Sequence, residues 1–556
     1  MVKPEYNLCH EAWIPARDAG GVRREVSMLE LFRNAHLYVA LAGESPTQNI
    51  AVLRLLLAVL HAVFGGKDIN GEPFDDDEEE QIDGAIELWK TLRNSGRFPF
   101  ERIDAYLKLY ESRFWLFHPE TPFYQIAGIT KGTEFTAAKL NGELLESANK
   151  PRLFPQRAGG EKENLSFPEA ARWLLHANGF DDTAAKPSQR GQGMPSPGAG
   201  WLGKLGLISA VGNNLFETLM LNLVLLPDVK RDIWGDGKAT WEEPPRTGER
   251  VQVSEPNSQA ALLTLQSRRL LLKREGNVVT GYYLLGGDFF PKENAFCEQM
   301  TVWKNNAKKD SDPPEYVPRR HKPSVQMWRD FAPLVEQRGG KDGMHRPGIV
   351  SWLNRLELRD TMLRFQICGL KYGDKDFFVE DAFSDSLSFN AGLISELGKE
   401  WADAVIEEIS VTEALVREVG ALAQKVARAA GVKDDREAWK CGAAARDKAK
   451  EQAYYSLDQP FRRWLESLDP NIPDPTGELM EQERNKWFGK AKSIIRGLGH
   501  DIVNECSPQA MVGRAIAGRE NEKREYISAP KAFERFMYKT DKRDTLMRKE
   551  GTDSGK

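Results

Sequence analysis

The sequence predicts an α+β protein in two parts: a large, irregular mixed N-terminal domain over residues 1–385 and a C-terminal four-helix bundle over residues 386–556. Alternating β-forming residues over 260–290 indicate a hairpin in the first part. Apolar residues recur at helical spacing beyond about Phe389, which indicates long helices in the second part. The chain has 556 residues, of which 41% are hydrophobic and 29% charged. This length and balance support sizeable cores in roughly two to four domains.

The first elements of the N-terminal part follow from local signals. Tyr6–Pro15 has the pattern of a short strand. Ser27 and Glu30 have the spacing of a capping box, which predicts the start of a helix. Asn49–Phe64 is strongly apolar and is followed by Gly65-Gly66, which predicts a helix that ends there.

The rest of the N-terminal part mixes core segments with long loops. Aromatic residues concentrate over residues 97–125, which predicts a packed core. Leu215–Leu226 is apolar and predicts a helix, and Glu275-Gly276-Asn277 is the expected turn of the hairpin. Stretches rich in Gly, Pro and charged residues predict loops at 149–163, 183–204, 304–324 and 339–348.

Four amphipathic segments joined by short loops make up the C-terminal part. Apolar residues follow helical spacing from Leu397 to Val426, from Asp435 to Leu468 and from Leu479 to Ile502. Ser507-Pro508 starts the fourth segment, which is split near residues 528–530. Such segments pack as a four-helix bundle.

Charge and cysteine content limit the classes of protein. The net charge of -5 excludes a strongly basic protein that coats nucleic acid, so any DNA contact must use local patches. The five scattered cysteines form no CxxC pair, which predicts no zinc site and favours a reducing compartment. The N-terminus lacks the apolar core of a signal peptide, and the apolar run Ile50–Phe64 is too short to span a bilayer. We therefore expect a cytoplasmic protein with no membrane partner.

Residues Gly198–Lys204 match G-x-x-x-x-G-K, the pattern of a phosphate-binding loop. The next residue is Leu205 instead of a magnesium-binding Ser or Thr, and no strand is predicted before the loop. We therefore expect a glycine-rich loop without a bound nucleotide. Such a loop lets the backbone approach a phosphate or a base edge closely.

Other catalytic patterns are incomplete. The dipeptide His500-Asp501 occurs in metal-dependent phosphohydrolases, but no further histidine stands at a recognisable spacing from it. His118 and Glu120 form H-x-E without the P-C-x-x-C of zinc deaminases. We expect no enzyme, no metal and no cofactor, and a structural role for His118.

Two basic features favour contact with nucleic acid. Residues 511–549 hold eleven Lys or Arg against six Asp or Glu. The loop Lys150–Arg157 combines cations with an aromatic residue, as loops that bind nucleic acid often do. A solvated surface remains the simpler interpretation of either patch alone.

The phrase Arg113–Gln125, RFWLFHPETPFYQ, resembles the hallmark of CasA, the family of large subunits of the type I-E CRISPR Cascade complex. The opening Leu8–Arg17 and the segment Gly212–Pro227 are similar to the same family, and the C-terminal bundle matches it in length and place. The resemblance spans nearly the whole chain.

The resemblance implies a non-catalytic subunit at one end of a crRNA-guided antiviral surveillance complex. Such a subunit reads the PAM, the short motif beside the target, from the minor groove, helps to open the duplex, and recruits a helicase–nuclease. The expected partners are the other Cascade subunits, crRNA, double-stranded target DNA and the helicase–nuclease. Guide pairing reads the rest of the sequence in RNA-guided systems. Minor-groove reading is degenerate, so tolerance for several PAM sequences is expected.

The resemblance also implies which residues contact nucleic acid. The family's first contacting loop is similar to residues 149–157, which points to Lys150, Arg152, Leu153, Phe154 and Arg157. Its glycine loop is similar to Gly198–Lys204, with Gly198, Gly200, Gly203 and Lys204 as contacts, and its lysine finger is nearest to Lys292, with Lys273 a weaker candidate. Its wedge falls near residues 339–346, where Met344, His345 and Arg346 replace the expected glutamine. Some relatives carry a four-cysteine zinc site near the hairpin, where this chain has only Cys297.

Two alternatives stay open at this point. One is an enzyme, either an NTPase that uses Gly198–Lys204 or a nuclease that uses His500. The other is a structural scaffold without direct DNA contact.

Overall fold

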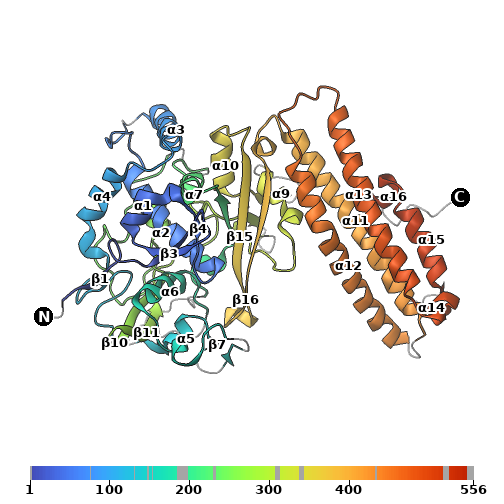
Figure 1. Cartoon of the computed structure of the whole chain (residues 1–556), viewed down its shortest axis with the longest axis horizontal. Coiled ribbons are helices and arrows are strands. Elements are labelled where there is room, and N and C mark those ends of the chain that lie inside the picture. The colour runs from blue at the N-terminus through green and yellow to red at the C-terminus, as the bar shows by residue number, and fades with distance from the viewer. Residues whose placement is uncertain are drawn as a thin grey trace. The chain divides into compact units, whose positions relative to one another are not determined.

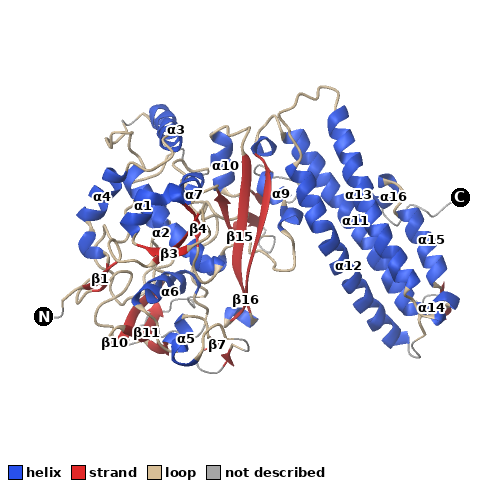
Figure 2. Ribbon diagram, viewed as in Figure 1, coloured by secondary structure: helices blue, strands red, loops and turns tan. Residues whose placement is uncertain are grey.

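The computed structural model describes residues 3–74, 77–129, 132–146, 150–152, 155–183, 198–228, 233–306, 314–336, 343–431, 435–516 and 525–547. The chain divides into two compact units. The first comprises Met1–Met327, Pro333–Leu358 and Leu363–Leu387, and the second Trp328–Ala332, Arg359–Met362 and Ser388–Lys556. The predicted α+β class with a helical C-terminal region is confirmed (Figures 1 and 2). That the chain forms two domains with a boundary after residue 385 stays a prediction.

The described part of the first unit is an irregular mixture of helices and small antiparallel sheets. Its helices are α1 (Met28–Asn34), α2 (Pro46–Phe64), α3 (Glu78–Asn94), α4 (Phe100–Leu109), α5 (Ala137–Leu140), α6 (Phe167–Phe180), α7 (Leu215–Asn222), α8 (Gln259–Leu263), α9 (Ala332–Val335, of which Ala332 belongs to the second unit) and α10 (Gly348–Arg355). Its sheets have the strand orders β3-β2-β4, β1-β5, β10-β11-β6, β7-β8, β13-β12-β14 and β16-β15-β9, of which Met362 in β15 and the last three residues of β16 belong to the second unit. The strand bounds follow with each sheet below.

The first two strands, which belong to different sheets, show where local reading of the sequence fails. Residues 6–15 form two strands instead of one, β1 (Glu5–Asn7) and β2 (Ile14–Asp18). β1 pairs with β5 (Trp115–Phe117), whereas β2 pairs with β3 (Arg23–Val26) and β4 (Tyr38–Leu41). A strand that changes partners cannot be recognised from alternation alone, because the partners lie far apart in the chain.

The predicted helix starts are largely confirmed. Ser27 accepts a hydrogen bond from the Glu30 amide at 3.2 Å, although the Glu30 carboxylate bonds to the Tyr38 hydroxyl at 3.3 Å instead of returning to the cap. α2 begins three residues earlier than predicted because Ser45 caps it and Pro46 occupies the first position. It ends at Phe64, as predicted.

α2 is the central helix of the first unit. By length and composition it passes as a membrane span, but 89% of its apolar window is buried inside the described structure. α6 and α8 pack against it. Inside this core Arg54 forms an ion pair with Glu298 at 2.9 Å, which satisfies the cation that interrupts the apolar run.

The predicted hairpin is confirmed. β10 (Arg268–Glu275) and β11 (Val278–Gly286) pair across a turn in which Gly276 has a φ of +58°. The sheet is completed by β6 (Thr133–Thr136), and α6 packs on β10 (Figure 2). The short hairpin β7 (Leu144–Glu146) and β8 (Lys150–Pro151) stands apart from this sheet.

Two further sheets were not predicted. β12 (Trp303–Asn305), β13 (Tyr316–Pro318) and β14 (Met344–His345) come from segments expected to be loops. β9 (Leu207–Val211), β15 (Met362–Tyr372) and β16 (Val379–Asn390) form the other sheet. The strands β12, β13 and β14, with two or three residues each, carry too short an alternation to be recognised in the sequence.

Local contacts also shorten one predicted helix. The helix expected over Leu215–Leu226 ends at Asn222. There the Asn222 side chain exchanges hydrogen bonds with the backbone of Ala210 on β9, with N···O distances of 3.0 and 2.6 Å. Tertiary pairing of this amide to a strand ends the helix early.

The second unit is helical. α11 (Lys399–Ala429), α12 (Asp435–Glu466) and α13 (Glu478–Asn504) pack together as the three long helices of the bundle (Figure 1). The fourth segment is divided further than predicted, into α14 (Pro508–Val512), the hairpin β17 (Arg514–Ile516) and β18 (Glu525–Ile527), α15 (Ala529–Lys539) and α16 (Arg543–Met547). α15 packs on α11 and α13 and so takes the fourth position.

Candidate nucleic-acid interface

The phrase Arg113–Gln125 forms a packed part of the first unit, as its aromatic content predicts. Phe114 and Phe123 are buried and stack with ring centroids 5.4 Å apart. Gln125 bridges two segments, because its amide nitrogen donates to the Leu116 carbonyl at 2.7 Å and its oxygen accepts from the Leu272 amide at 2.8 Å. His118 accepts hydrogen bonds from the Glu120 and Thr121 amides, which confirms its structural role.

The segment 150–157 is held by Glu143. The Glu143 carbonyl accepts from the Arg152 amide at 2.9 Å, and its carboxylate accepts from the Gln156 amide at 2.9 Å. Glu143 is only 4% exposed, so this clip fixes both sides of the loop tip. The predicted contacts Leu153 and Phe154 lie outside the described residues, as does the side chain of Lys150.

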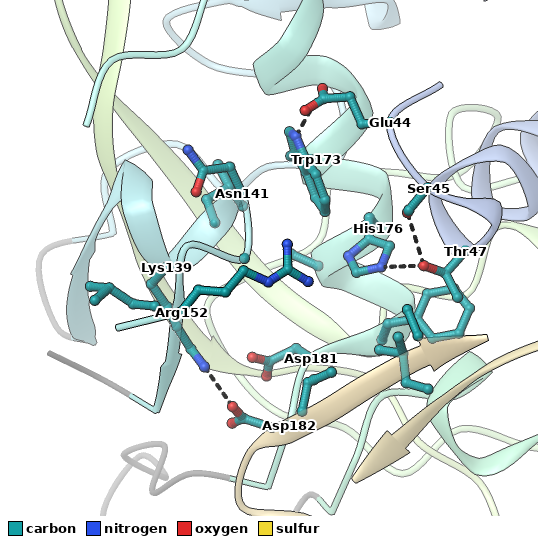
Figure 3. Close-up of a pocket in the computed structure, with 18 of the residues that line it drawn as sticks. Glu44, Ser45, Thr47, Lys139, Asn141, Arg152, Trp173, His176, Asp181 and Asp182 are labelled. Atoms are coloured by element: carbon teal, nitrogen blue, oxygen red, sulfur yellow. Dashed lines mark hydrogen bonds and ion pairs between the residues drawn. The ribbon is translucent and has the colours of Figure 1, made fainter. Parts of the chain in front are cut away.

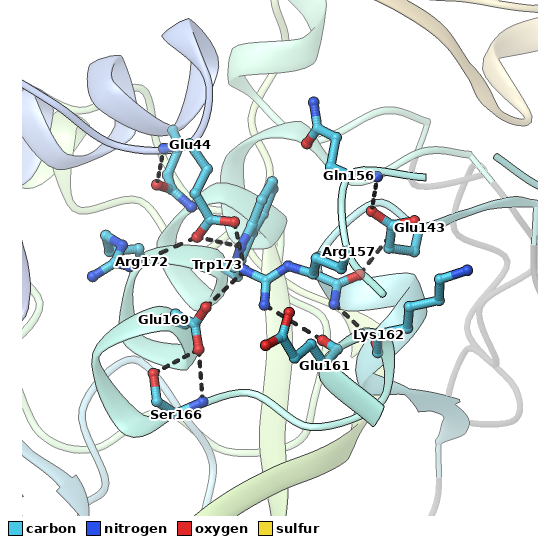
Figure 4. Close-up of polar contacts among 12 residues, drawn as sticks. Glu44, Glu143, Gln156, Arg157, Glu161, Lys162, Ser166, Glu169, Arg172 and Trp173 are labelled. Atoms are coloured by element: carbon cyan, nitrogen blue, oxygen red, sulfur yellow. Dashed lines mark hydrogen bonds and ion pairs between the residues drawn. The ribbon is translucent and has the colours of Figure 1, made fainter. Parts of the chain in front are cut away.

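Arg157 belongs to a compact ion-pair cluster (Figure 4). Its guanidinium lies 2.5 Å from the Glu44 carboxylate and 2.9 Å from the Glu169 carboxylate, and its side chain is 12% exposed. Burial alone would lower the pKa of Arg157, but the bonds and charges of Glu44 and Glu169 raise it above its ordinary value. The charge is already neutralised, so the geometry favours a positioning role for Arg157.

The same cluster organises α6. Glu169 accepts from the Ser166 amide at 2.9 Å and from its hydroxyl at 2.6 Å, which completes a capping box. Glu44 accepts from the Trp173 indole nitrogen at 3.1 Å. Arg157 therefore ties the loop to the first turns of α6 and to the segment that precedes α2.

Arg152 has the opposite environment. Its side chain extends into a cavity and has no ion pair or side-chain hydrogen bond within the described part of the chain (Figure 3). The cavity has a volume of about 360 Å³. Ser45 and Thr47 line it from the start of α2, and Trp173 and His176 line it from α6.

The imidazole of His176 is held in a fixed orientation on the cavity wall. Its Nε2 lies 3.1 Å from the Thr47 hydroxyl, and its ring stacks on Phe180 with centroids 4.9 Å apart. Burial lowers the pKa of His176 to about 4, against an opposing effect of Asp181. The ring is therefore neutral at physiological pH.

The glycine segment, Gly198–Lys204, is packed closely against neighbouring residues and is largely closed to solvent. A Cβ on Gly200 would stand 2.3 Å from the Gly179 carbonyl oxygen, and one on Gly203 would stand 2.3 Å from the Tyr372 hydroxyl. Both glycines are buried, and only Gly198, with a φ of +63°, is partly exposed. Close packing against the end of α6 and β15 accounts for the glycines.

The NTPase alternative is not supported by this geometry. Residues 202–204 form a single 3-10 turn that leads into β9, so no α-helix begins at the end of the motif. A phosphate-binding loop needs a helix N-terminus at that place. His500 lies on α13 against Phe533, with ring centroids 4.8 Å apart. Among the residues that the structure describes, no three His, Cys, Asp or Glu side chains gather as a metal site.

The structure brings together Lys204 and Lys292, which are far apart in the sequence. The pKa of Lys204 is lowered to about 8, first by burial and then by the charges of Arg268, Lys292, Arg250 and Arg320. Lys292 is exposed, and neither lysine forms an ion pair within the described ranges. We call Lys204, Arg250, Lys292 and Arg320 the basic cluster. Lys204 and Lys292 in this cluster are both residues that the sequence analysis singled out.

Arg268 connects the basic cluster to the cavity. Its guanidinium pairs with the Asp181 carboxylate and donates to the carbonyls of Asp182 and Gly198, the latter at 2.6 Å. Asp181 and Asp182 also line the cavity. Sequence reasoning missed Arg268, Asp181 and Asp182, because nothing in the local pattern marks these charged residues as a buried link.

The wedge candidates are largely fixed in the fold. Arg346 is 8% exposed and donates from Nε to the Ser351 hydroxyl at 2.8 Å. The His345 ring stacks on Phe296 with centroids 5.4 Å apart. Met344 is partly exposed on β14, directly after Gly343, and residues 337–342 lie outside the described part. Lys273, the weaker candidate for the lysine finger, pairs with Glu134.

Comparison with known proteins places this arrangement in a family. A family model described as CRISPR-associated protein Cse1 matches residues 7–498. The chain belongs to the Cse1 family. The CRISPR-associated protein CasA/Cse1 of Thermus thermophilus is 31% identical over 344 residues, and the alignment covers 61% of each chain.

Solved structures agree with the Cse1 assignment. The crystal structure of Thermobifida fusca Cse1 is 30% identical, covers 98% of both chains and superposes with a TM-score of 0.80. A chain of a CRISPR RNA-guided surveillance complex is 17% identical, with a TM-score of 0.66 over 98% of this chain and 100% of the other, which shows a shared fold. The predicted resemblance to CasA is confirmed.

Proposed function

We propose that this Cse1-family chain is the non-catalytic large subunit of a crRNA-guided DNA surveillance complex in the cytoplasm. In this role it recognises the PAM in the minor groove of the target duplex, helps to open the duplex and recruits a helicase–nuclease. Its partners are the other subunits of the complex, crRNA and double-stranded DNA. Membership of the Cse1 family supports the assembly, and the basic cluster supports the contact with DNA.

The observation that carries the DNA contact is the convergence of Lys204 and Lys292. Burial lowers the pKa of Lys204 first, and the charges of four neighbouring cations, Lys292 among them, lower it further, so positive charge gathers at this place. A phosphate brought to the cluster relieves that repulsion and replaces water with charge-assisted hydrogen bonds. Arg320 is already paired with Asp376 at 2.8 Å, which leaves the two lysines as the main phosphate ligands.

The same geometry modifies the expected roles of the neighbouring residues. Gly198 is the partly exposed member of the glycine segment and is the candidate for a close approach to the minor groove. Met344 is the candidate wedge, because an apolar side chain of this kind inserts between base steps in minor-groove proteins. Arg346 is held by the Ser351 hydroxyl of α10, so its role is to fix this segment and not to contact DNA.

The test is target-duplex binding by the reconstituted guide complex carrying Lys204→Gln and Lys292→Gln together. Loss of two phosphate contacts reduces the slope of log K against log[salt] by about 2 and lowers affinity by roughly 100-fold at low salt. Lys90→Gln, an exposed lysine on α3, is the matched control and should leave both quantities unchanged.

A scaffold without DNA contact gives a different result. In that case the double variant binds the target with the same affinity and the same salt slope as the wild type. Such an outcome would remove the DNA-contact proposal while leaving the assignment to the Cse1 family intact.

A further inference from the structure

Four carboxylates line the cavity beside Arg152, and three of them have cationic partners, while the fourth, Asp381, is exposed. Among its carboxylates, Asp182 pairs with Lys139 at 2.6 Å, and Asp181 pairs with Arg268. Glu44 lies within ion-pair distance of Arg157 and Arg172, two arginines with few exposed atoms. Arg152 has no such partner in the described ranges, although its guanidinium reaches into the same space (Figure 3). An arginine left unpaired in a concave site favours an anionic ligand, and its planar fork matches a phosphate.

Besides the cation, the cavity offers a flat aromatic surface, which α6 provides. His176 is partly exposed to the cavity, and its ring is braced by Phe180 on one side and by Trp173 at its edge, with centroid distances of 4.9 Å in both cases. Since the ring is neutral at physiological pH, it presents an aromatic face and not a second cation. Planar rings stack on such faces with little dependence on their identity.

The rim adds an acceptor. Asp381 on β16 lines the cavity and is exposed, and the hydrogen bond recorded for its side chain is the one that its Oδ1 accepts from the Ala382 amide at 2.9 Å. Its second oxygen accepts no hydrogen bond from a described residue, which leaves an acceptor for a ligand. Carboxylates accept from the exocyclic amino groups of nucleobases, as Asp and Glu do from cytosine N4.

The size of the cavity limits the ligand. A volume of about 360 Å³ lies near the lower end of small-molecule sites, which run from ~300 to ~1,000 Å³. One nucleotide has this scale, whereas a double helix does not enter a space of this size. Anion, planar ring and amino group are the three features that the walls recognise, and a single unpaired nucleotide has all of them.

We propose that this cavity binds one unpaired nucleotide of a nucleic-acid strand. The Arg152 guanidinium binds its phosphate, the His176 ring stacks against its base, and Asp381 accepts from an amino group of that base. The proposal rests on the proposed function, which brings both guide RNA and opened target DNA to this chain. Both strands offer the same chemistry, so the source of the nucleotide is decided by experiment.

The test is calorimetric titration of the full chain with four probes: 5′-CMP, 5′-dCMP, inorganic phosphate and a short acidic peptide. The expected result is saturable one-site binding of the nucleotides that is at least tenfold tighter than that of phosphate or peptide. Preference for the ribose form points to the guide, and preference for the deoxyribose form points to the opened target. Equal binding of the two forms supports the site and shows that it does not contact the 2′-hydroxyl. Absence of saturable nucleotide binding, or equal binding of phosphate or peptide, overturns the proposal.

Variants locate the site. Arg152→Gln weakens nucleotide binding at least tenfold, Arg152→Lys weakens it less, and both keep the wild-type melting temperature. Unchanged binding by Arg152→Gln overturns the proposal. Lys90→Gln, an exposed lysine on α3 outside the cavity, leaves nucleotide binding unchanged.

The same variants separate the two hypotheses. If Lys204→Gln with Lys292→Gln leaves duplex affinity intact while Arg152→Gln removes nucleotide binding, the DNA-contact proposal fails and the cavity proposal stands. The reverse pattern overturns the cavity proposal alone.

Discussion

The cavity and the ion-pair cluster around Arg157 meet at Trp173, and they use similar residues for opposite purposes. Trp173 lines the cavity, while its indole nitrogen donates to Glu44 within the cluster. In the cluster, Arg157 is 12% exposed and bonded to two carboxylates. In the cavity, Arg152 has no ion pair with a described residue. Two arginines five positions apart thus divide into one that holds the structure and one that is available to a ligand.

The contrast between Arg152 and Arg157 shows that the number of cations in a loop does not measure its capacity to bind nucleic acid. Both arginines contribute equally to a sequence-level basic patch. Only the structure shows that Glu44 and Glu169, more than one hundred and about ten residues away from Arg157, have already taken up its charge.

The largest effect should come from the cluster. Arg157→Gln leaves Glu44 and Glu169 without their shared partner in a partly buried site and should lower the free energy of unfolding by about 3 kcal/mol. Arg152→Gln should change it by less than about 0.5 kcal/mol. Urea unfolding of both variants measures the contrast, and equal losses would contradict the division between them.

The next effect concerns the clip that positions Arg152. Glu143→Ala removes the carboxylate that accepts from the Gln156 amide and should cost about 1.5 kcal/mol of local stability. Hydrogen exchange of the Gln156 amide should then be about tenfold faster. Glu143→Gln keeps an acceptor oxygen and serves as the control. Exchange unaltered by the alanine would show that the loop is held by other contacts.

The smallest effect is a pH dependence from the basic cluster. The pKa of Lys204 is about 8 in the folded chain and 10.5 in its ordinary state, so the unfolded chain binds more protons between these values. The free energy of unfolding should therefore rise with pH from about 8 to 10.5, by about 1 kcal/mol for this partly exposed side chain. Urea unfolding at pH 8 and pH 10 measures this rise. It should disappear in Lys204→Gln, and a rise of the same size in the variant would assign it to other groups.

Local signals predicted those parts of the fold that short-range physics determines. The caps at Ser27 and Ser507, the hairpin turn at Gly276 and the end of α2 all follow from residues within a few positions of the feature. The double strand at the N-terminus and the sheet β12–β14 do not, because their pairing partners are distant in the chain.

The candidate site also contains residues that the sequence predicted and residues that only the structure reveals. The sequence and its family resemblance pointed to Arg152, Lys204 and Lys292, and the structure brings the two lysines together. Gly200 and Gly203 are explained by close packing against Gly179 and Tyr372. A sequence motif does not show these contacts. The link through Arg268 and the clip by Glu143 depend on buried contacts of single side chains, which composition does not reveal.

The most direct test of the proposed role is target-duplex binding by the reconstituted guide complex, with and without this chain, on DNA with a correct or a scrambled flanking motif. We expect the complex that contains the chain to prefer the correct flank and the complex without it to show no preference. Equal binding to both flanks in the presence of the chain would contradict PAM recognition and would leave the chain as a scaffold of the assembly.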